Sequence, residues 1–108
     1  MTTVLDHLQS ISRDLDKAID DLKTLELAAE NAEAAYRVAK AKAFLSAEGP
    51  VQAREHQAVL ATQTELIQRG EAAALVRVQV QRVKSLHARI DVGRTVASAE
   101  RLLAGVVT

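Results

Sequence analysis

Apolar residues follow two long helical runs separated by a short break. In the first run they recur at alternating steps of four and three, and twelve successive positions fit this spacing. A heptad seam of this length is typical of a coiled coil. We therefore predict a helix over residues 3–47, capped by Thr2 or Thr3 with Asp6 near its positive end. The seam positions are Val4, Leu8, Ile11, Leu15, Ala18, Leu22, Leu25, Ala29, Ala32, Tyr36, Ala39 and Ala43.

The break is a turn at residues 48–50, where Gly49 is followed by the only proline, Pro50. Glycine can adopt the left-handed conformation that ends a helix, and proline suits the first turn of the next one. A turn this short makes the two helices antiparallel neighbours. It also predicts that residue i pairs with about 98 minus i, so that Leu15 faces Val83.

The second run predicts a helix over residues 51–92 with a less regular seam. The alternating stretch "LVRVQVQRV" suggests a strand, but we reject that reading because helical patterns flank it and a lone strand has nothing to pair with. Gly93 marks a bend, after which a new register begins in a short third helix or extension over 95–105. The seam consists of Val59, Leu66, Ala73, Val76, Val80, Val83, His87 and Ile90, and the new register of Val92, Val96, Ala99, Leu103 and Val106.

These patterns predict a single all-α domain over residues 1–108, a long antiparallel helical hairpin resembling a coiled coil, with a short C-terminal third helix or extension. The net charge is zero, which gives no global electrostatic case for nucleic acid or membrane binding. Cysteine is absent, and the start of the chain has no basic and apolar leader pattern. No apolar run is long enough to span a bilayer. These features fit a cytoplasmic protein, in the host cytoplasm if it is phage-encoded.

The chain has more large apolar residues than two helices can bury along one seam. One interpretation is a surface for self-association or for a partner protein. The other is that residues 95–106 fold back and cover these side chains. The candidate surface residues are Leu5, Ile19, Leu27, Leu60, Ile67 and Leu75.

Five basic residues of the second run are candidate contacts for nucleic acid: Arg77, Arg82, Lys84, Arg89 and Arg94. We favour a different role, pairing with the acidic stretch of the first helix, because no aromatic residue accompanies them to stack bases. The acidic partners would be Asp14, Asp16, Asp20 and Asp21.

Other chemistry has little support in the sequence. His87 and Asp91 are spaced four apart, and the pairing rule brings Asp6 and His7 near them, but we interpret His87 as a seam residue rather than a metal ligand. No nucleophile stands at motif spacing from a base, and no glycine-rich phosphate loop is present. We therefore expect neither an enzyme nor a bound cofactor.

The stretch "AAYRVAKAKAFLSAEGPVQAREHQAVL", residues 34–60, resembles small helical proteins of bacteriophages, including those of actinobacterial phages. In that pattern an A-Y-x-x-A-K-A stretch ends one helix, a turn with glycine follows, and an Arg-x-x-x-x-Ala stretch opens the next helix. The matching residues are Ala35, Tyr36, Ala39, Lys40, Ala41, Gly49 and Arg54, while Val59 replaces the final alanine. The resemblance implies a phage accessory protein and transfers no functional residues.

Our leading hypothesis is a non-enzymatic interaction or assembly protein that works through a coiled-coil surface. Its partner would be a second copy of itself, or a host or phage protein. The first alternative is a nucleic-acid-binding accessory of phage DNA replication or recombination. The second alternative is a component of virion assembly.

Overall fold

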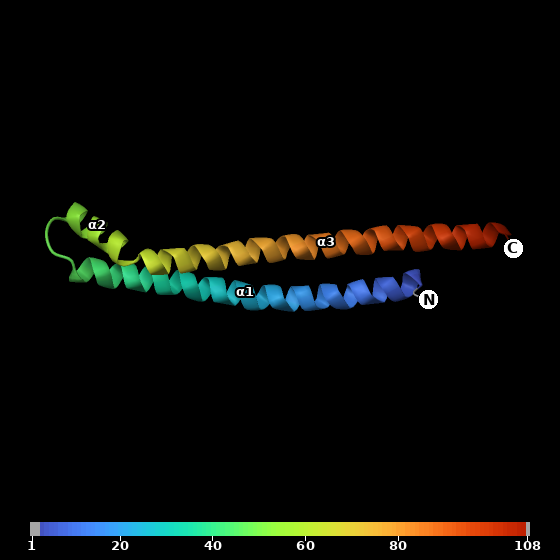
Figure 1. Ribbon diagram of the computed structural model, residues 1–108, viewed down its shortest axis with the longest axis horizontal. Helices are drawn as coiled ribbons and strands as arrows, with labels where there is room; N and C mark the ends of the chain where they lie inside the picture. The colour runs from blue at the N-terminus through green and yellow to red at the C-terminus, as the bar shows by residue number, and fades with distance from the viewer. Residues whose placement is uncertain (1–2, 108) are drawn as a thin grey trace. The chain divides into compact units, whose positions relative to one another are not determined.

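The computed structural model describes residues 3–107, and the side chains of residues 3–105. Within this range the chain forms three helices and no strand: α1 (Val4–Ser46), α2 (Val51–Ala61) and α3 (Gln63–Val107). The two long helices, α1 and α3, run side by side in opposite directions (Figure 1). The predicted all-α helical hairpin is therefore confirmed. The alternating valine stretch lies inside α3, so it is helix and not strand.

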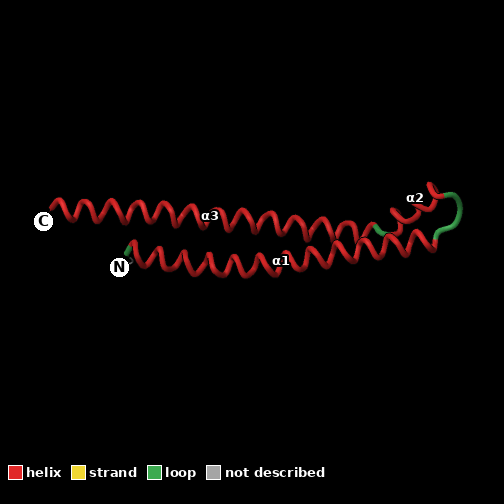
Figure 2. The backbone as a smooth tube through the Cα atoms, turned by 180° about the vertical axis from the view of Figure 1, so that it is seen from behind, coloured by secondary structure: helices red, strands yellow, loops and turns green. Residues whose placement is uncertain are grey.

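The start of α1 and the turn that follows this helix have the expected local chemistry. At the start of α1, the backbone N–H of Asp6 donates to Thr3 Oγ1 at 3.0 Å, and the N–H of Thr3 donates back to Asp6 Oδ2 at 3.3 Å. Thr3 is thus the cap, and Thr2 lies outside the described residues. Gly49 has φ 103°, the left-handed conformation that favours glycine, and Pro50 precedes α2 with φ −63°. Figure 2 shows this connection as the loop between α1 and α2.

The helix predicted over residues 51–92 is instead interrupted at Thr62. The Thr62 hydroxyl donates to the carbonyl of Ala58 at 2.7 Å, and its backbone N–H lies 3.4 Å from the carbonyl of Val59. A buried threonine that bonds back to the carbonyl four residues earlier bends a helix. Gln63 strengthens the break, because its side-chain amide donates to the Val59 carbonyl at 2.7 Å.

Gly93, by contrast, does not interrupt α3, which runs without a break to Val107. A helical glycine costs only about 1 kcal/mol relative to alanine, and packing in a long helix outweighs that cost. Residues 95–105 are therefore the expected extension of the second helix. The alternative in which they fold back over the apolar flanks is wrong.

The chain divides into two compact units. The first combines the start of α1, up to Leu22, with α3 from Val78 onwards, and the second spans Lys23–Arg77. The core of the first unit is Leu15, Ala18, Leu86 and Ile90, with Ile11, Ile19 and Val83 packed against it. In the second unit the buried residues are Ala58 and Thr62.

The predicted seam of α1 is confirmed at every position. All twelve residues from Val4 to Ala43 are buried or half-buried. The positions between them are mostly exposed, as expected for a helix with one packed face.

The seam of the returning chain differs from the prediction. The buried and half-buried positions again follow steps of four and three, but several are polar or small. His87 and Val59, which the prediction placed in the seam, are exposed. The other six predicted positions are buried or half-buried: Leu66, Ala73, Val76, Val80, Val83 and Ile90. Apolar character misled the assignment at Val59, which lies one position to the side of the packed series. That series is Ala58, Thr62, Glu65, Arg69, Ala72 and Val76 in the second unit, and Gln79, Val83, Leu86, Ile90, Gly93 and Ala97 in the first.

The pairing register is also shifted by about one helical turn. Leu15 packs in one core cluster with Leu86 and Ile90, and Val83, which the rule placed opposite it, packs against the same cluster. The same rule pairs Glu33 with residue 65, but the side chain that reaches Glu33 is Arg69. The rule fails because it starts the pairing directly after the turn. Ala58 is the first buried residue of α2, so the seam begins later.

Candidate interaction surfaces

Large apolar side chains are unusually exposed in this structure. Among the described residues, fourteen Leu, Ile and Val side chains are exposed, and five apolar residues are buried. The accessible surface is 8159 Å². A compact monomer of this mass, 11.7 kDa, exposes roughly 5,900 Å². The chain thus exposes roughly 2,300 Å² more than a compact protein of its mass.

Five of the six predicted surface residues are exposed: Leu5, Leu27, Leu60, Ile67 and Leu75. Ile19 is half-buried and packs against the core of the first unit, so it is the least accessible of the six. It lies next to the seam residue Ala18, so a helix packed at this position covers it.

The exposed members of that set do not form one patch. In the second unit, Leu27 lies midway between the seam positions Leu25 and Ala29, on the outer side of α1. Ile67 lies midway between Glu65 and Arg69, on the outer side of α3. These two outer sides face away from each other, so Leu27 and Ile67 belong to different surfaces.

A second apolar series runs along α3 in the first unit. Val92, Val96, Ala99 and Leu103 are spaced by four, three and four residues, and all four are exposed. We call them the C-terminal stripe. Val106 continues the spacing, but its side chain lies outside the described residues. This series is the new register that the sequence predicts, and it lies beside the seam that contacts α1.

A groove of about 870 Å³ lies between the start of α1 and α3 in the first unit. The Leu8 side chain fills the space where a Cβ of residue 93 would lie, so the two helices approach closely at Gly93. Val92 and Val96 of the C-terminal stripe line the groove. His7, Asp14 and Arg89 add polar groups to an otherwise mostly apolar lining, which also includes Val4, Leu8, Ile11 and Ala88.

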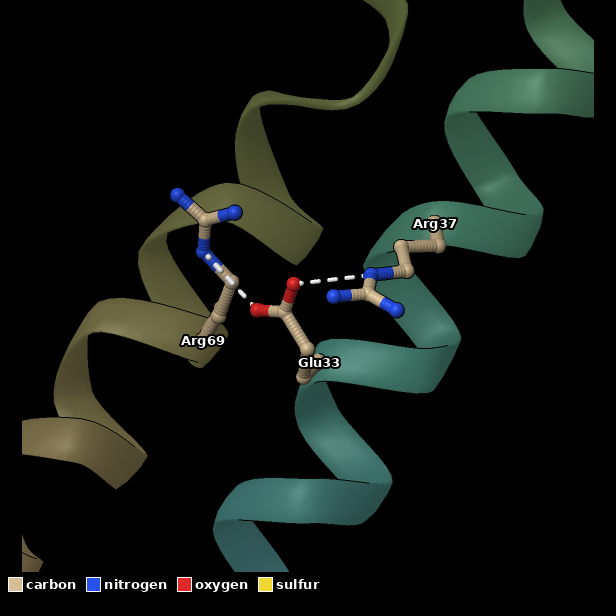
Figure 3. Close-up of polar contacts among 3 residues, drawn as sticks. All are labelled: Glu33, Arg37 and Arg69. Atoms are coloured by element: carbon tan, nitrogen blue, oxygen red, sulfur yellow. Dashed lines mark hydrogen bonds and ion pairs between the residues drawn. The ribbon is translucent and has the colours of Figure 1, made fainter.

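A polar cluster joins α1 to α3 in the second unit. The Glu33 carboxylate forms ion pairs with two arginines (Figure 3). The Nε of Arg37, on α1, lies 3.0 Å from one carboxylate oxygen, and the Nε of Arg69, on α3, lies 3.5 Å from the other. The Arg69 guanidinium also lies 4.3 Å from the centre of the Tyr36 ring, a cation–π arrangement. Arg69 occupies a seam position, so this cluster fixes how the two helices match. The prediction did not place Arg69 in the seam because it followed apolar residues only. Steps of four and three residues, taken without regard to polarity, would have included Arg69.

A second polar contact fixes the seam of the first unit. The Gln79 side-chain amide donates to the backbone carbonyl of Ala18 at 2.9 Å, across the two helices. This bond, like the cluster around Glu33, uses a polar side chain at a seam position. Both contacts are internal to the fold.

The candidate nucleic-acid residues are all exposed, but they do not form one stripe. In the first unit, Arg82 and Arg89 are seven residues apart and share a side of α3, whereas Lys84 and Arg94 lie on other sides. Arg77 belongs to the second unit. Contact with nucleic acid stays a prediction, and so does the pairing of these residues with the four aspartates.

Within residues 3–107, no three His, Asp or Glu side chains come close enough together to hold a metal ion. His87 is exposed, so its assignment to the seam was wrong. No helix in the described part of the chain is both long and apolar enough to cross a bilayer.

Comparison with protein-family models, with curated proteins and with solved structures finds no match to this chain.

Proposed function

We propose that this chain is a protein–protein interaction protein that associates through coiled-coil surfaces, with a second copy or with another protein. The observation that carries the proposal is the excess of exposed apolar side chains over buried ones. A standard protein–protein interface covers about 800 Å² on each partner. The fourteen exposed Leu, Ile and Val side chains supply apolar surface for such an interface.

The polar side chains of the seam support the same proposal. Arg69 binds Glu33 and stacks on Tyr36, and Gln79 binds the carbonyl of Ala18. Each of these groups is used to match one helix to the other. Their role is therefore to specify the fold, and the surface left for function is apolar helix.

The resemblance over residues 34–60 suggests a phage accessory protein whose partner is a host or phage protein. Virion assembly is one form of the same proposal, since it also requires contact between proteins. A nucleic-acid accessory is a different proposal, and the scattered arrangement of the basic residues does not favour it.

Sedimentation velocity from micromolar to submillimolar concentration tests the proposal, together with affinity capture and mass spectrometry. We expect the sedimentation coefficient to rise with concentration, or a defined protein to be recovered. Ile67→Lys places a charge on the outer side of α3, and Gln68→Lys is the matched control at the neighbouring exposed position. A concentration-independent monomer that captures no protein would contradict the proposal.

A further inference from the structure

A groove of about 620 Å³ lies in the second unit, beside the polar cluster around Glu33. Both aromatic residues of the chain, Tyr36 and Phe44, line it, and both are half-buried. Three cations and two carboxylates line the same groove, so its lining carries one net positive charge. We call it the cation–aromatic groove. Its charged residues are Arg37, Lys40, Arg69, Glu33 and Glu55.

The fold leaves most of the cationic groups of this groove available. Glu33 is shared between Arg37 and Arg69, and each arginine approaches it with its Nε nitrogen (Figure 3). Among the residues that the structure describes, the terminal nitrogens of both guanidinium groups donate no hydrogen bond. Lys40 is half-buried and forms no ion pair within the same range. An added carboxylate can therefore pair with these groups without displacing a contact of the fold.

The spacing of the groove residues on α1 defines the shape of a ligand that fits. Arg37, Lys40 and Phe44 are three and four residues apart, so they lie on one side of the helix. Phe44 is about 6 Å along the helix axis from Lys40. One face of the Tyr36 ring is already occupied by the Arg69 guanidinium, 4.3 Å from the ring centre. A ligand fits if its carboxylate reaches Arg37 and Lys40 while an aromatic ring, one helical turn away, packs on Phe44.

We propose that the cation–aromatic groove binds an acidic segment of a different protein, in which a carboxylate and an aromatic side chain lie one helical turn apart. This inference rests on the proposed function and names the chemistry of the partner. Tyrosine and arginine are among the residue types that carry most of the binding energy in protein interfaces. A second copy of the chain does not supply the ring, because Tyr36 and Phe44 are its only aromatic residues and both already line the groove.

The charge pattern favours a protein segment over nucleic acid in this groove. A nucleic-acid strand brings one phosphate per nucleotide, and its binding relies on several cations that release counterions. Glu33 and Glu55 stand among the three cations of the groove, and carboxylates repel a row of phosphates. A single carboxylate, by contrast, needs only the two cations that α1 presents.

A peptide titration followed by amide NMR shifts of the full chain tests the groove. The probe is an alanine-based helical peptide that carries one Glu and one Trp four residues apart. We expect saturable shifts centred on residues 36–45. Two control peptides, with Gln in place of the Glu or Ala in place of the Trp, should each bind at least about threefold more weakly.

Two variants of the chain locate the binding, each judged against one control. Lys40→Gln and Arg37→Gln should weaken binding of the probe peptide about threefold to fivefold. The Arg37 side chain is 76% exposed, so its replacement leaves the fold intact. Lys42→Gln makes the same change as Lys40→Gln at an exposed position about 200° around the helix, and should leave the affinity within about twofold.

Several results would overturn the inference. One is the absence of saturable shifts around the groove, and another is equal binding of the Glu and Gln peptides. Equal effects of Lys40→Gln and Lys42→Gln would show that binding depends on general charge and not on the groove. Tighter binding of single-stranded DNA than of the peptide would replace the protein partner with nucleic acid. The proposed function would survive these results if the chain self-associates, or if it captures a protein equally well after Lys40→Gln.

Discussion

Truncation of Leu15 to alanine tests the packed seam more sharply than any other single change. Leu15 is 8% exposed and lies in one cluster with Ala18, Leu86 and Ile90. Leu45 on the same helix is 79% exposed. The two substitutions Leu15→Ala and Leu45→Ala make the same chemical change and the same change in helix propensity. They differ in how much of the side chain is packed.

The expected cost follows from the buried hydrocarbon. Leu→Ala removes about three carbon groups, each worth about 0.8 kcal/mol when buried, which gives about 2.4 kcal/mol at Leu15. A cavity adds to this cost, and measured Leu→Ala losses span about 2–5 kcal/mol. The seam of two helices is open at its sides and can collapse around the gap. We therefore expect about 2–3 kcal/mol for Leu15→Ala and less than about 0.5 kcal/mol for Leu45→Ala.

Urea unfolding followed by circular dichroism measures both free energies, and thermal unfolding should show a difference of about 10–20 °C. The measurements should be made at a concentration where all variants sediment as the same species. Otherwise a change in association adds to the change in folding. If the two variants differ by less than about 0.5 kcal/mol, Leu15 is not a packed core residue and the seam described above is wrong.

Three further predictions test the turn, the polar cluster and the basic residues. Nothing lies within 4 Å of a Cβ added at Gly70, so Gly70→Ala should raise the free energy of unfolding by about 0.5–1 kcal/mol. Gly49 has φ 103°, so Gly49→Ala should lower it by about 1 kcal/mol. Urea unfolding of both variants checks that the two effects have opposite signs. Arg69→Ala should lower the free energy of unfolding by about 1 kcal/mol, because the ion pair with Glu33 and the stacking on Tyr36 are both lost. Arg37→Ala, which removes the other ion pair of Glu33, should lower it by less than about 0.5 kcal/mol. Equal losses in the two variants would show that Arg69 has no special role. Fluorescence polarisation at about 50 mM salt should show no binding of short DNA; binding that weakens steeply with salt, and that is lost on neutralising the basic residues, would revive the alternative function through Arg77, Arg82, Lys84, Arg89 and Arg94.

The sequence predicts one half of this hairpin far better than the other, for a physical reason. Every seam position of α1 is apolar, so its pattern and its burial coincide. The matching seam on the returning chain includes Thr62, Arg69, Gln79 and Gly93, which packing tolerates because each finds a specific contact. Apolar Val59 lies beside that seam and attracts the assignment to the wrong position. The interruption at Thr62 depends on a single hydrogen bond from its hydroxyl to the carbonyl of Ala58. The spacing of apolar residues carries no sign of such a bond.

The candidate surfaces could likewise be predicted only in part from the sequence. The exposure of most of the chosen residues could be predicted from their positions beside the predicted seams of the two runs. Their grouping could not, because it depends on the register between helices, and that register is shifted by about one turn. Leu27 and Ile67 lie on the outer sides of different helices, whereas the stripe around Ala99 is a continuous apolar series on one helix.

The unequal distribution of buried hydrocarbon has a consequence for how the native protein opens. Leu15, Leu86 and Ile90 all lie in the first unit, whereas the buried residues of the second unit are Ala58 and Thr62. Local opening exposes little apolar surface where the packed residues are small, so its free-energy cost is low there. Backbone amides of α2 and the adjoining turns should exchange with solvent deuterium before those around Leu86. Limited proteolysis should first cut the same region, so that the hairpin opens at its turn before the packed seam around Leu86 separates.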